Sequence, residues 1–362
     1  GAALYNLGAE EVLVVGHSEC GMAGADAEAL KEKMLARGIK EEIAAAVAVY
    51  LHGKSGDLAA EKLGQDSIIA TDIIKYLPSM KYQGFNAIEV TPMQPLKTDR
   101  LDIPWYLYFQ PVGFRIGNQI GSKQDLIELC TAAKEYGLRI IADVVCCHVA
   151  DGDYGEFMIN KRVDKEINRP EFFKPLQSIY NWDDRYEVIT KCLQTLPALN
   201  LANHELQDII IRFLNEYIEC GVRGFRFDAA KQIPLPHEDY PFSMTYHCDF
   251  WPRVLSNLNH KDELFNYAEV LHYPKEMIDM YTPYIHVITQ CIGSDPDRIV
   301  SYISNHDTEK EFGSTSQKRD EEIIDLYKIL ASRFKHTQFY ARPFHDDWMF
   351  SNELRYANYQ MR

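Results

Sequence analysis

Four acidic residues stand at the ends of short apolar runs in this sequence: Asp143, Asp228, Glu269 and Asp307. Each lies at or just beyond the carboxyl end of a predicted β-strand, and in a parallel barrel those ends converge on one face. Unpaired carboxylates in a low-dielectric cleft cost folding free energy, so four of them together indicate a functional site. Two carboxyl groups about 5 Å apart can cleave a glycosidic bond with retention of configuration.

The local context divides the roles between two of these carboxyl groups. Arg226 precedes Asp228 by two residues, so both side chains project to the same face of one strand. A permanent positive charge there keeps Asp228 ionised, as a nucleophile requires. Glu269 follows Ala268 in the apolar run FNYAEVL, a setting that favours the protonated form of a general acid. The alternative is that these are structural carboxylates paired with arginines at a strand rim.

The elements that must position these residues alternate between β-branched runs and amphipathic helices. A helix capped by Ser122 has an apolar face and ends at Gly137, and another runs over 206–220. That first face comprises Leu126, Leu129, Cys130, Ala133 and Tyr136. Eight strands are predicted, at 11–16, 86–91, 139–145, 224–228, 265–271, 285–289, 299–304 and 337–342. Apolar strands separated by helices predict an α/β fold with a parallel sheet, and eight of them close a (β/α)8 TIM barrel.

The chain divides into three predicted parts. Residues 1–79 form an atypical amino-terminal strand–helix segment. Residues 80–148 and 197–362 form the barrel, and residues 149–196 lack a clear period. We therefore expect an irregular insertion subdomain after the third barrel strand.

Composition excludes several classes of partner. A formal net charge of -15 opposes nucleic-acid binding, and no apolar run is long enough to cross a membrane. The eight cysteines are scattered through apolar contexts, which indicates buried free thiols and a reducing compartment. Together with the lack of a signal-like start, this favours the cytoplasm. The alternative is a secreted protein whose signal has been removed.

Five segments between about residues 80 and 345 resemble motifs of the α-amylase family of glycoside hydrolases, in that family's order. GFRFDAAK (224–231) resembles the nucleophile motif, which implies Asp228 as nucleophile, Arg226 as its arginine and Lys231 as a sugar contact. YAEVL (267–271) is similar to the acid/base motif, which implies Glu269 as the proton donor.

Two further motifs supply partners for these groups. SNHDT (304–308) resembles the motif that stabilises the distorted sugar, which implies Asp307 in that role, His306 as a contact of the same ring and Asn305 as a supporting residue. ADVVCCH (142–148) resembles the strand-three motif, which implies Asp143 as a partner of Arg226 and His148 as a sugar contact. For the two histidines the alternative is burial in the core.

The fifth motif is aromatic. PWYLYFQPVGF (104–114) is similar to the family's aromatic platform, which puts Trp105, Tyr106 and Phe109 along the substrate cleft. Core packing or a plain surface loop is an equally acceptable interpretation of these side chains.

The resemblance also shows departures at calcium-related positions. Cys147, Ala198 and Gln232 stand where many members have calcium-linked residues. A thiol and a methyl group offer no oxygen ligand to a hard cation. We therefore predict no metal there, and no cofactor.

The amino-terminal residues resemble other families. EEVLVVGHSECGM, within residues 1–42, resembles part of a β-class carbonic anhydrase, with His17 and Cys20 matching two zinc ligands. Two ligands cannot close a zinc site, so zinc is not expected. Residues 47–78 resemble the last helices of an NAD(P)H-hydrate dehydratase. The chain thus resembles a mosaic.

We predict retaining cleavage or transfer at α-1,4-glucosidic bonds of starch-like glucans or maltooligosaccharides. The partner would be an oligo- or polysaccharide. The family's β-sandwich domain does not follow the last predicted strand. The rival hypothesis is therefore an incomplete, inactive amylase-like barrel that at most binds glucans.

Overall fold

The computed structural model describes residues 3–6, 12–15, 73–74, 77–78, 81, 85–100, 103–271, 273–289, 295–302, 329–330 and 332–338. Two compact units are distinguished, each considered by itself. The first comprises residues 1–68 and 341–359, and the second comprises residues 69–340 and 360–362.

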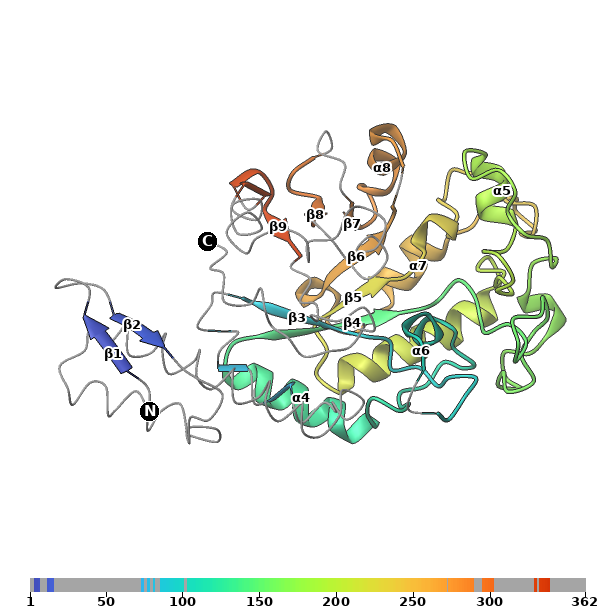
Figure 1. The fold of residues 1–362 in the computed structure, drawn as a ribbon. Helices are drawn as coiled ribbons and strands as arrows, with labels where there is room; N and C mark the ends of the chain where they lie inside the picture. The colour runs from blue at the N-terminus through green and yellow to red at the C-terminus, as the bar shows by residue number, and fades with distance from the viewer. Residues whose placement is uncertain are drawn as a thin grey trace. The chain divides into compact units, whose positions relative to one another are not determined.

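The second unit contains a parallel sheet whose strands follow one another in chain order (Figure 1). Within the described residues its seven strands pair side by side, each parallel to the next. The strands are β3 (Ala87–Val90), β4 (Arg139–Val144), β5 (Gly224–Phe227), β6 (Phe265–Glu269), β7 (His286–Ile288), β8 (Ile299–Ser301) and β9 (His336–Thr337). The predicted α/β architecture is confirmed as a parallel half-barrel of the TIM-barrel type.

The strand predicted at 11–16 forms but does not join that sheet. Its residues make β2 (Val12–Val15), which pairs antiparallel with β1 (Ala3–Asn6) in a separate two-stranded sheet. Few residues separate the two strands, and a short connection permits only antiparallel pairing. The prediction that the strand at 11–16 is the first of eight barrel strands is therefore wrong.

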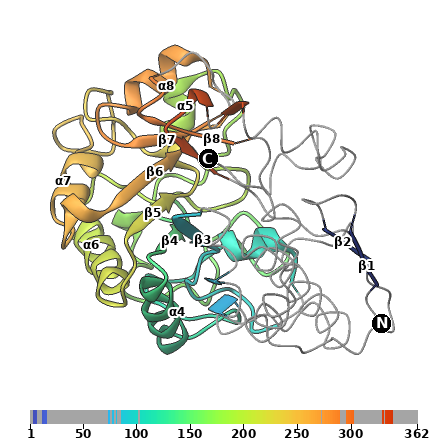
Figure 2. The same ribbon diagram turned by 90° about the vertical axis from the view of Figure 1, so that its left-hand side faces the viewer.

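Two long helices cover one face of strands β3–β5, where they lie side by side (Figures 1 and 2). Helix α4 (Lys123–Glu135) begins with a capping box at Ser122, and α6 (His204–Glu219) begins at an Asn203 cap. Both bury the apolar stripe predicted from their period. Tyr136 is an exception, since it lies at the helix end and is 39% exposed.

The segment 149–196 consists mainly of turns and bends, with the short helices η3 (Pro170–Phe172) and α5 (Arg185–Thr190). Figure 1 places α5 and its loops beyond the arrowhead of β4, at the carboxyl side of the sheet. The remaining helices are η2 (Trp105–Phe109), η4 (Ala230–Gln232), α7 (Phe250–Ser256), η5 (Lys261–Glu263) and α8 (Lys275–Tyr281). The predicted domain boundaries stay a prediction.

Close packing at the base of the sheet requires a glycine. A Cβ on Gly224 would lie 2.1 Å from the carbonyl oxygen of Phe265 on the neighbouring strand. Strands β5 and β6 can pair as they do only because this position lacks a side chain.

The cysteines of the described part are all free and buried: Cys130, Cys146, Cys147, Cys192, Cys220 and Cys248. This confirms the prediction of buried thiols for these six, while Cys20 and Cys291 lie outside the described residues. Among the described helices, none has the length and apolar character needed to cross a membrane.

Candidate active site

The guanidinium of Arg226 is the centre of a buried charged cluster. Its Nη1 donates to both oxygens of Asp143, at 2.8 and 3.0 Å, and to Oδ1 of Asp228 at 2.8 Å. Its Nη2 donates to Oε1 of Glu269. All four residues are less than 10% exposed. One buried cation therefore holds three carboxylates.

Strand order brings these groups together. Asp143 on β4 is in register with Arg226 on β5, and β6 lies on the other side of β5. Asp228 directly follows β5 and its backbone N–H donates to the carbonyl of Val144 at 3.0 Å. Glu269 is the last residue of β6. The carboxyl ends of three adjacent parallel strands thus supply the cluster.

The turn after β5 contributes a further donor. Ala229 has a left-handed φ of 45°, and its N–H donates to Oε2 of Glu269 at 2.8 Å. Glu269 therefore has a guanidinium and an amide as partners, and the expectation of a simply apolar setting is wrong. The apolar neighbours in sequence do not reveal partners that come from another strand.

Burial changes the pKa of two carboxyl groups in this interior, Asp143 and Glu89. Burial raises the pKa of Asp143 well above its ordinary value, while the Arg226 charge acts in the opposite direction. Burial likewise raises the pKa of Glu89 on β3, which accepts hydrogen bonds from the Tyr267 hydroxyl and from Nε2 of Gln338. Sequence analysis missed Glu89, although a lone acid in the apolar strand AIEV is a readable signal.

His148 lies beside the cluster and is 1% exposed. Its Nε2 lies 2.9 Å from the carbonyl oxygen of Phe109, and its Nδ1 lies 3.3 Å from Sγ of Cys147. Burial lowers the pKa of His148 to about 4. A neutral ring that donates through Nε2 and accepts at Nδ1 satisfies both neighbours. A sugar would therefore have to share Nε2 with the Phe109 carbonyl.

The predicted aromatic residues occupy different environments. The Phe109 ring lies 5.7 Å from the guanidinium carbon of Arg226, whereas Tyr106 is 50% exposed. The backbone of Trp105 opens η2, and its side chain lies outside the described residues. Nζ of Lys231 lies 4.6 Å from the ring centre of Trp182, a residue of the segment 149–196.

Three predicted site residues, Asn305, His306 and Asp307, lie outside the described residues. His17 and Cys20, where no zinc site was expected, lie outside them as well. The structure thus brings Asp228 and Glu269 together with Arg226 and Asp143, while their catalytic roles stay a prediction.

The calcium-related positions surround a buried lysine. The backbone N–H of Lys174 donates to the carbonyl of Ala198 at 2.9 Å, and its Nζ lies 3.5 Å from the carbonyl oxygen of Gln232. The thiol of Cys147 lies 3.9 Å from Oε1 of Gln232. An ammonium and a thiol at this place do not fit a hard divalent cation. Across the described ranges, no group of three or more His, Cys, Asp or Glu side chains could hold a metal ion.

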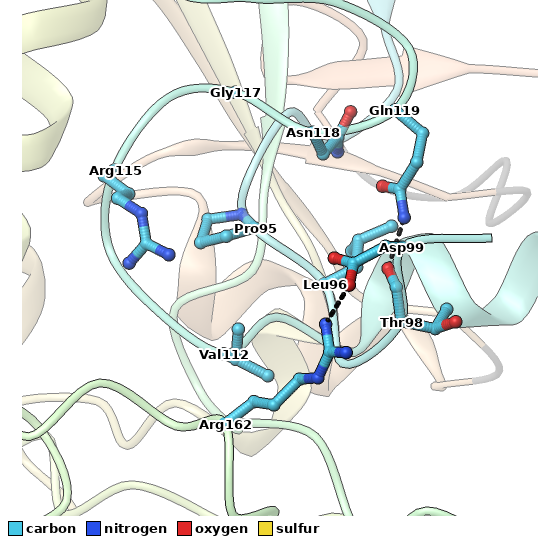
Figure 3. A pocket seen from close by; sticks show the side chains of 10 residues that line it. All are labelled: Pro95, Leu96, Thr98, Asp99, Val112, Arg115, Gly117, Asn118, Gln119 and Arg162. Atoms are coloured by element: carbon cyan, nitrogen blue, oxygen red, sulfur yellow. Dashed lines mark hydrogen bonds and ion pairs between the residues drawn. The ribbon is translucent and has the colours of Figure 1, made fainter. Parts of the chain in front are cut away.

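A separate pocket of about 660 Å³ is lined by residues outside the cluster, among them Pro95, Asp99, Arg115 and Arg162 (Figure 3). Arg162 forms an ion pair with Asp99 across it at 2.8 Å, and Gln119 donates to the carbonyl of Thr98. None of the predicted site residues lines it. Its arginines are already paired, Arg162 with Asp99 and Arg115 with Asp164, so this pocket is not the candidate active site.

Curated relatives of the chain include α-amylases. The chain is 33% identical to an α-amylase of Clostridium acetobutylicum over 219 residues, which cover 60% of this chain and 28% of that protein. It is 24% identical to an α-amylase of Butyrivibrio fibrisolvens over 319 residues, which cover 72% of this chain and 32% of that protein. The matched part is thus less than a third of either relative. Nothing in the comparisons supports the carbonic anhydrase or dehydratase resemblances.

Solved structures share the fold at low identity. The α-amylase of Geobacillus thermoleovorans, complexed with acarbose, has a TM-score of 0.57 at 16% identity, over 81% of this chain and 68% of that one. A variant of α-amylase I from Eisenia fetida, in complex with maltohexaose, has a TM-score of 0.55 at 16% identity, over 79% and 67%. The family profile "Alpha amylase, catalytic domain" matches residues 70–322, which is more than half of the chain. With its parallel half-barrel and its strand-end carboxylates, the chain belongs to the alpha-amylase family of glycoside hydrolases.

Proposed function

We propose that this protein cleaves α-1,4-glucosidic bonds of starch-like glucans or maltooligosaccharides with retention of configuration. The observation that carries the proposal is the single buried guanidinium of Arg226, which binds both Asp228 and Glu269. Two carboxyl groups on one guanidinium are close neighbours, which suits the pair about 5 Å apart that retention requires.

In this mechanism Asp228 attacks the anomeric carbon while the bond to the leaving oxygen breaks. Glu269 gives its proton to that oxygen, and a covalent glycosyl–enzyme ester forms on Asp228. Glu269 then takes a proton from water, whose oxygen attacks the anomeric carbon and releases Asp228. In the proposal Arg226 supplies the positive charge beside the nucleophile Asp228, and it also binds Asp143 and Glu269.

The proposal assigns substrate contacts to further residues. Trp182 and Lys231 form a cation–π pair, with Trp182 37% exposed, so the ring can stack on a sugar. Asp307 and His306 would bind the distorted ring, as their motif resemblance implies. The acarbose and maltohexaose complexes of the Geobacillus and Eisenia proteins support a glucan as the ligand. We also propose the segment 149–196 as an insertion subdomain beside the cleft.

The test is release of reducing sugar from soluble starch and from maltooligosaccharides, with NMR of the first product. We expect the α-anomer to form first. Glu269→Gln should lower turnover by about 10²–10⁴-fold and Asp228→Asn by at least as much. The matched controls are Asp208→Asn and Glu263→Gln, both at exposed carboxylates outside the cluster.

Near-normal cleavage by either cluster variant would refute the assignment of roles, and a β-anomeric first product would refute retention. Absence of cleavage by the folded wild type would refute the enzymatic proposal. Maltohexaose binding by that protein would then establish the rival hypothesis of an inactive, glucan-binding barrel.

A further inference from the structure

Three successive carbonyl oxygens after the Asp228 turn each face a cation from the segment 149–196. Nη1 of Arg185 donates to the carbonyl of Lys231, and its Nη2 donates to that of Ile233 at 3.3 Å. Between them, Nζ of Lys174 lies 3.5 Å from the carbonyl oxygen of Gln232. The end of η4 thus contacts two positively charged side chains.

Lys174 is buried, whereas Arg185 is partly buried. Lys174 is 2% exposed, donates to the carbonyl of Ile189 at 2.7 Å and lies 5.8 Å from the Tyr240 ring centre. Among the residues that the structure describes, no ion pair joins Lys174 to a carboxylate. Burial lowers the pKa of Lys174 to about 8, so the ammonium form predominates at neutral pH.

Arg185 is fixed from two sides. Its guanidinium binds both oxygens of Glu238, at 2.5 and 2.7 Å, and lies 5.5 Å from the Tyr281 ring centre. A bidentate pair of this kind sets the plane of the guanidinium, which directs its remaining donors at the turn.

The turn that these cations hold is directly connected to the proposed catalytic carboxylates. Asp228 precedes it, and Ala229 donates its N–H to Glu269 from a left-handed conformation that a non-glycine residue rarely adopts. A shift of η4 would therefore move both carboxyl groups relative to each other.

We propose that Lys174 and Arg185 act as positioning residues, a two-cation clamp that fixes the Asp228 turn to the segment 149–196 without a metal ion. Lys174 lies against Ala198 and Gln232, two of the positions with a calcium-related counterpart, and its charge would repel a divalent cation. The catalytic part of this inference rests on the proposed function, and the structural part does not.

The first test removes the charge and restores it from solution. Lys174→Ala should lose about 100-fold in kcat, because small misplacements of reacting groups cost that much, with a smaller change in KM. Propylammonium, which replaces the missing end of the side chain, should restore most of the loss. The neutral 1-propanol should not. Lys161→Ala is the matched control, since Lys161 is an exposed lysine of the same segment.

The second test does not depend on activity. In the Lys174→Met variant, hydrogen–deuterium exchange should be faster than in the wild type in the peptides that contain residues 229–233. The helices α4 and α6 should keep the protection that they have in the wild type. Met retains the volume of the side chain, which favours folding. If Lys174→Met does not fold, Arg185→Met takes its place with the same expected exchange.

Unchanged exchange in a folded clamp variant would overturn the inference, as would equal rescue by 1-propanol and propylammonium. If the wild type cleaves no glucan, the proposed function fails, and the exchange experiment still decides the clamp. Added calcium should leave wild-type activity and exchange unchanged. A gain in activity, or a fall in exchange at the turn, would overturn the metal-free clamp.

Discussion

Replacement of Arg226 by Met tests whether one cation stabilises the whole carboxylate cluster. Arg226 is 2% exposed, and its guanidinium donates to Asp143, Asp228 and Glu269. Met replaces the aliphatic part of the arginine side chain without its charge, so the variant leaves three buried carboxyl groups without their cation.

The expected loss follows from that geometry. Removing one partner of a buried ion pair costs about 3–5 kcal/mol of folding stability, because the other charge stays buried. The loss should depend on pH. Burial raises the pKa of Asp143 in the folded protein above its unfolded value, and removal of Arg226 raises it further. The folded state then binds more protons than the unfolded state, so stability falls as pH rises, by about 1.4 kcal/mol per pH unit and proton.

The assay is urea unfolding followed by circular dichroism at pH 5 and pH 8. We expect Arg226→Met to lose about 3–5 kcal/mol at pH 8 and clearly less at pH 5. The matched control is Arg223→Met, three residues earlier, whose side chain is 33% exposed and 3.9 Å from Glu263. It should lose about 1 kcal/mol at both pH values. Equal losses in the two variants, or a larger loss at pH 5 for Arg226→Met, would refute the reasoning.

Three further predictions concern single sites. The His148 ring should titrate by NMR with a midpoint at about 4, because burial lowers its pKa. Folding stability should fall as pH drops below about 6.5, the ordinary pKa of a histidine, because the unfolded chain then binds a proton that the folded protein does not. A midpoint near 6.5 in the folded protein would contradict this. Gly224→Ala should cost about 1–3 kcal/mol in thermal unfolding, because its Cβ would meet the Phe265 carbonyl oxygen at 2.1 Å. Gly121→Ala should cost less, because its one tight contact is the flexible end of Met93 and its contacts with Asp125 are at ordinary distances. The six buried cysteines should resist a thiol reagent in the native protein and react after unfolding; rapid native labelling at these positions would show that they are accessible.

Local sequence was sufficient for most of the secondary structure. The run RIIADVV predicted a strand at 139–145, and β4 covers Arg139–Val144. Ser122 predicted the start of α4, and its side chain and that of Asp125 make the capping box. These features depend on neighbours within a few residues, which a sequence displays directly.

The predictions that failed required knowledge of distant partners. The strand at 11–16 formed, but only its pairing with Ala3–Asn6 decided which sheet it joined. The neighbours of Glu269 in sequence are apolar, yet Arg226 and Ala229 from another strand supply its partners.

The sequence by itself determined which residue types end the strands, and so which carboxyl groups could form a site. Only the tertiary structure decided that Arg226 binds three of them at once. It also brought Lys174 and Arg185 to the turn after Asp228, across separations of 58 and 46 residues. The segment that carries both cations has no period from which a contact could be predicted. Its position depends on burial and on carbonyl partners, which exist only when the chain is folded.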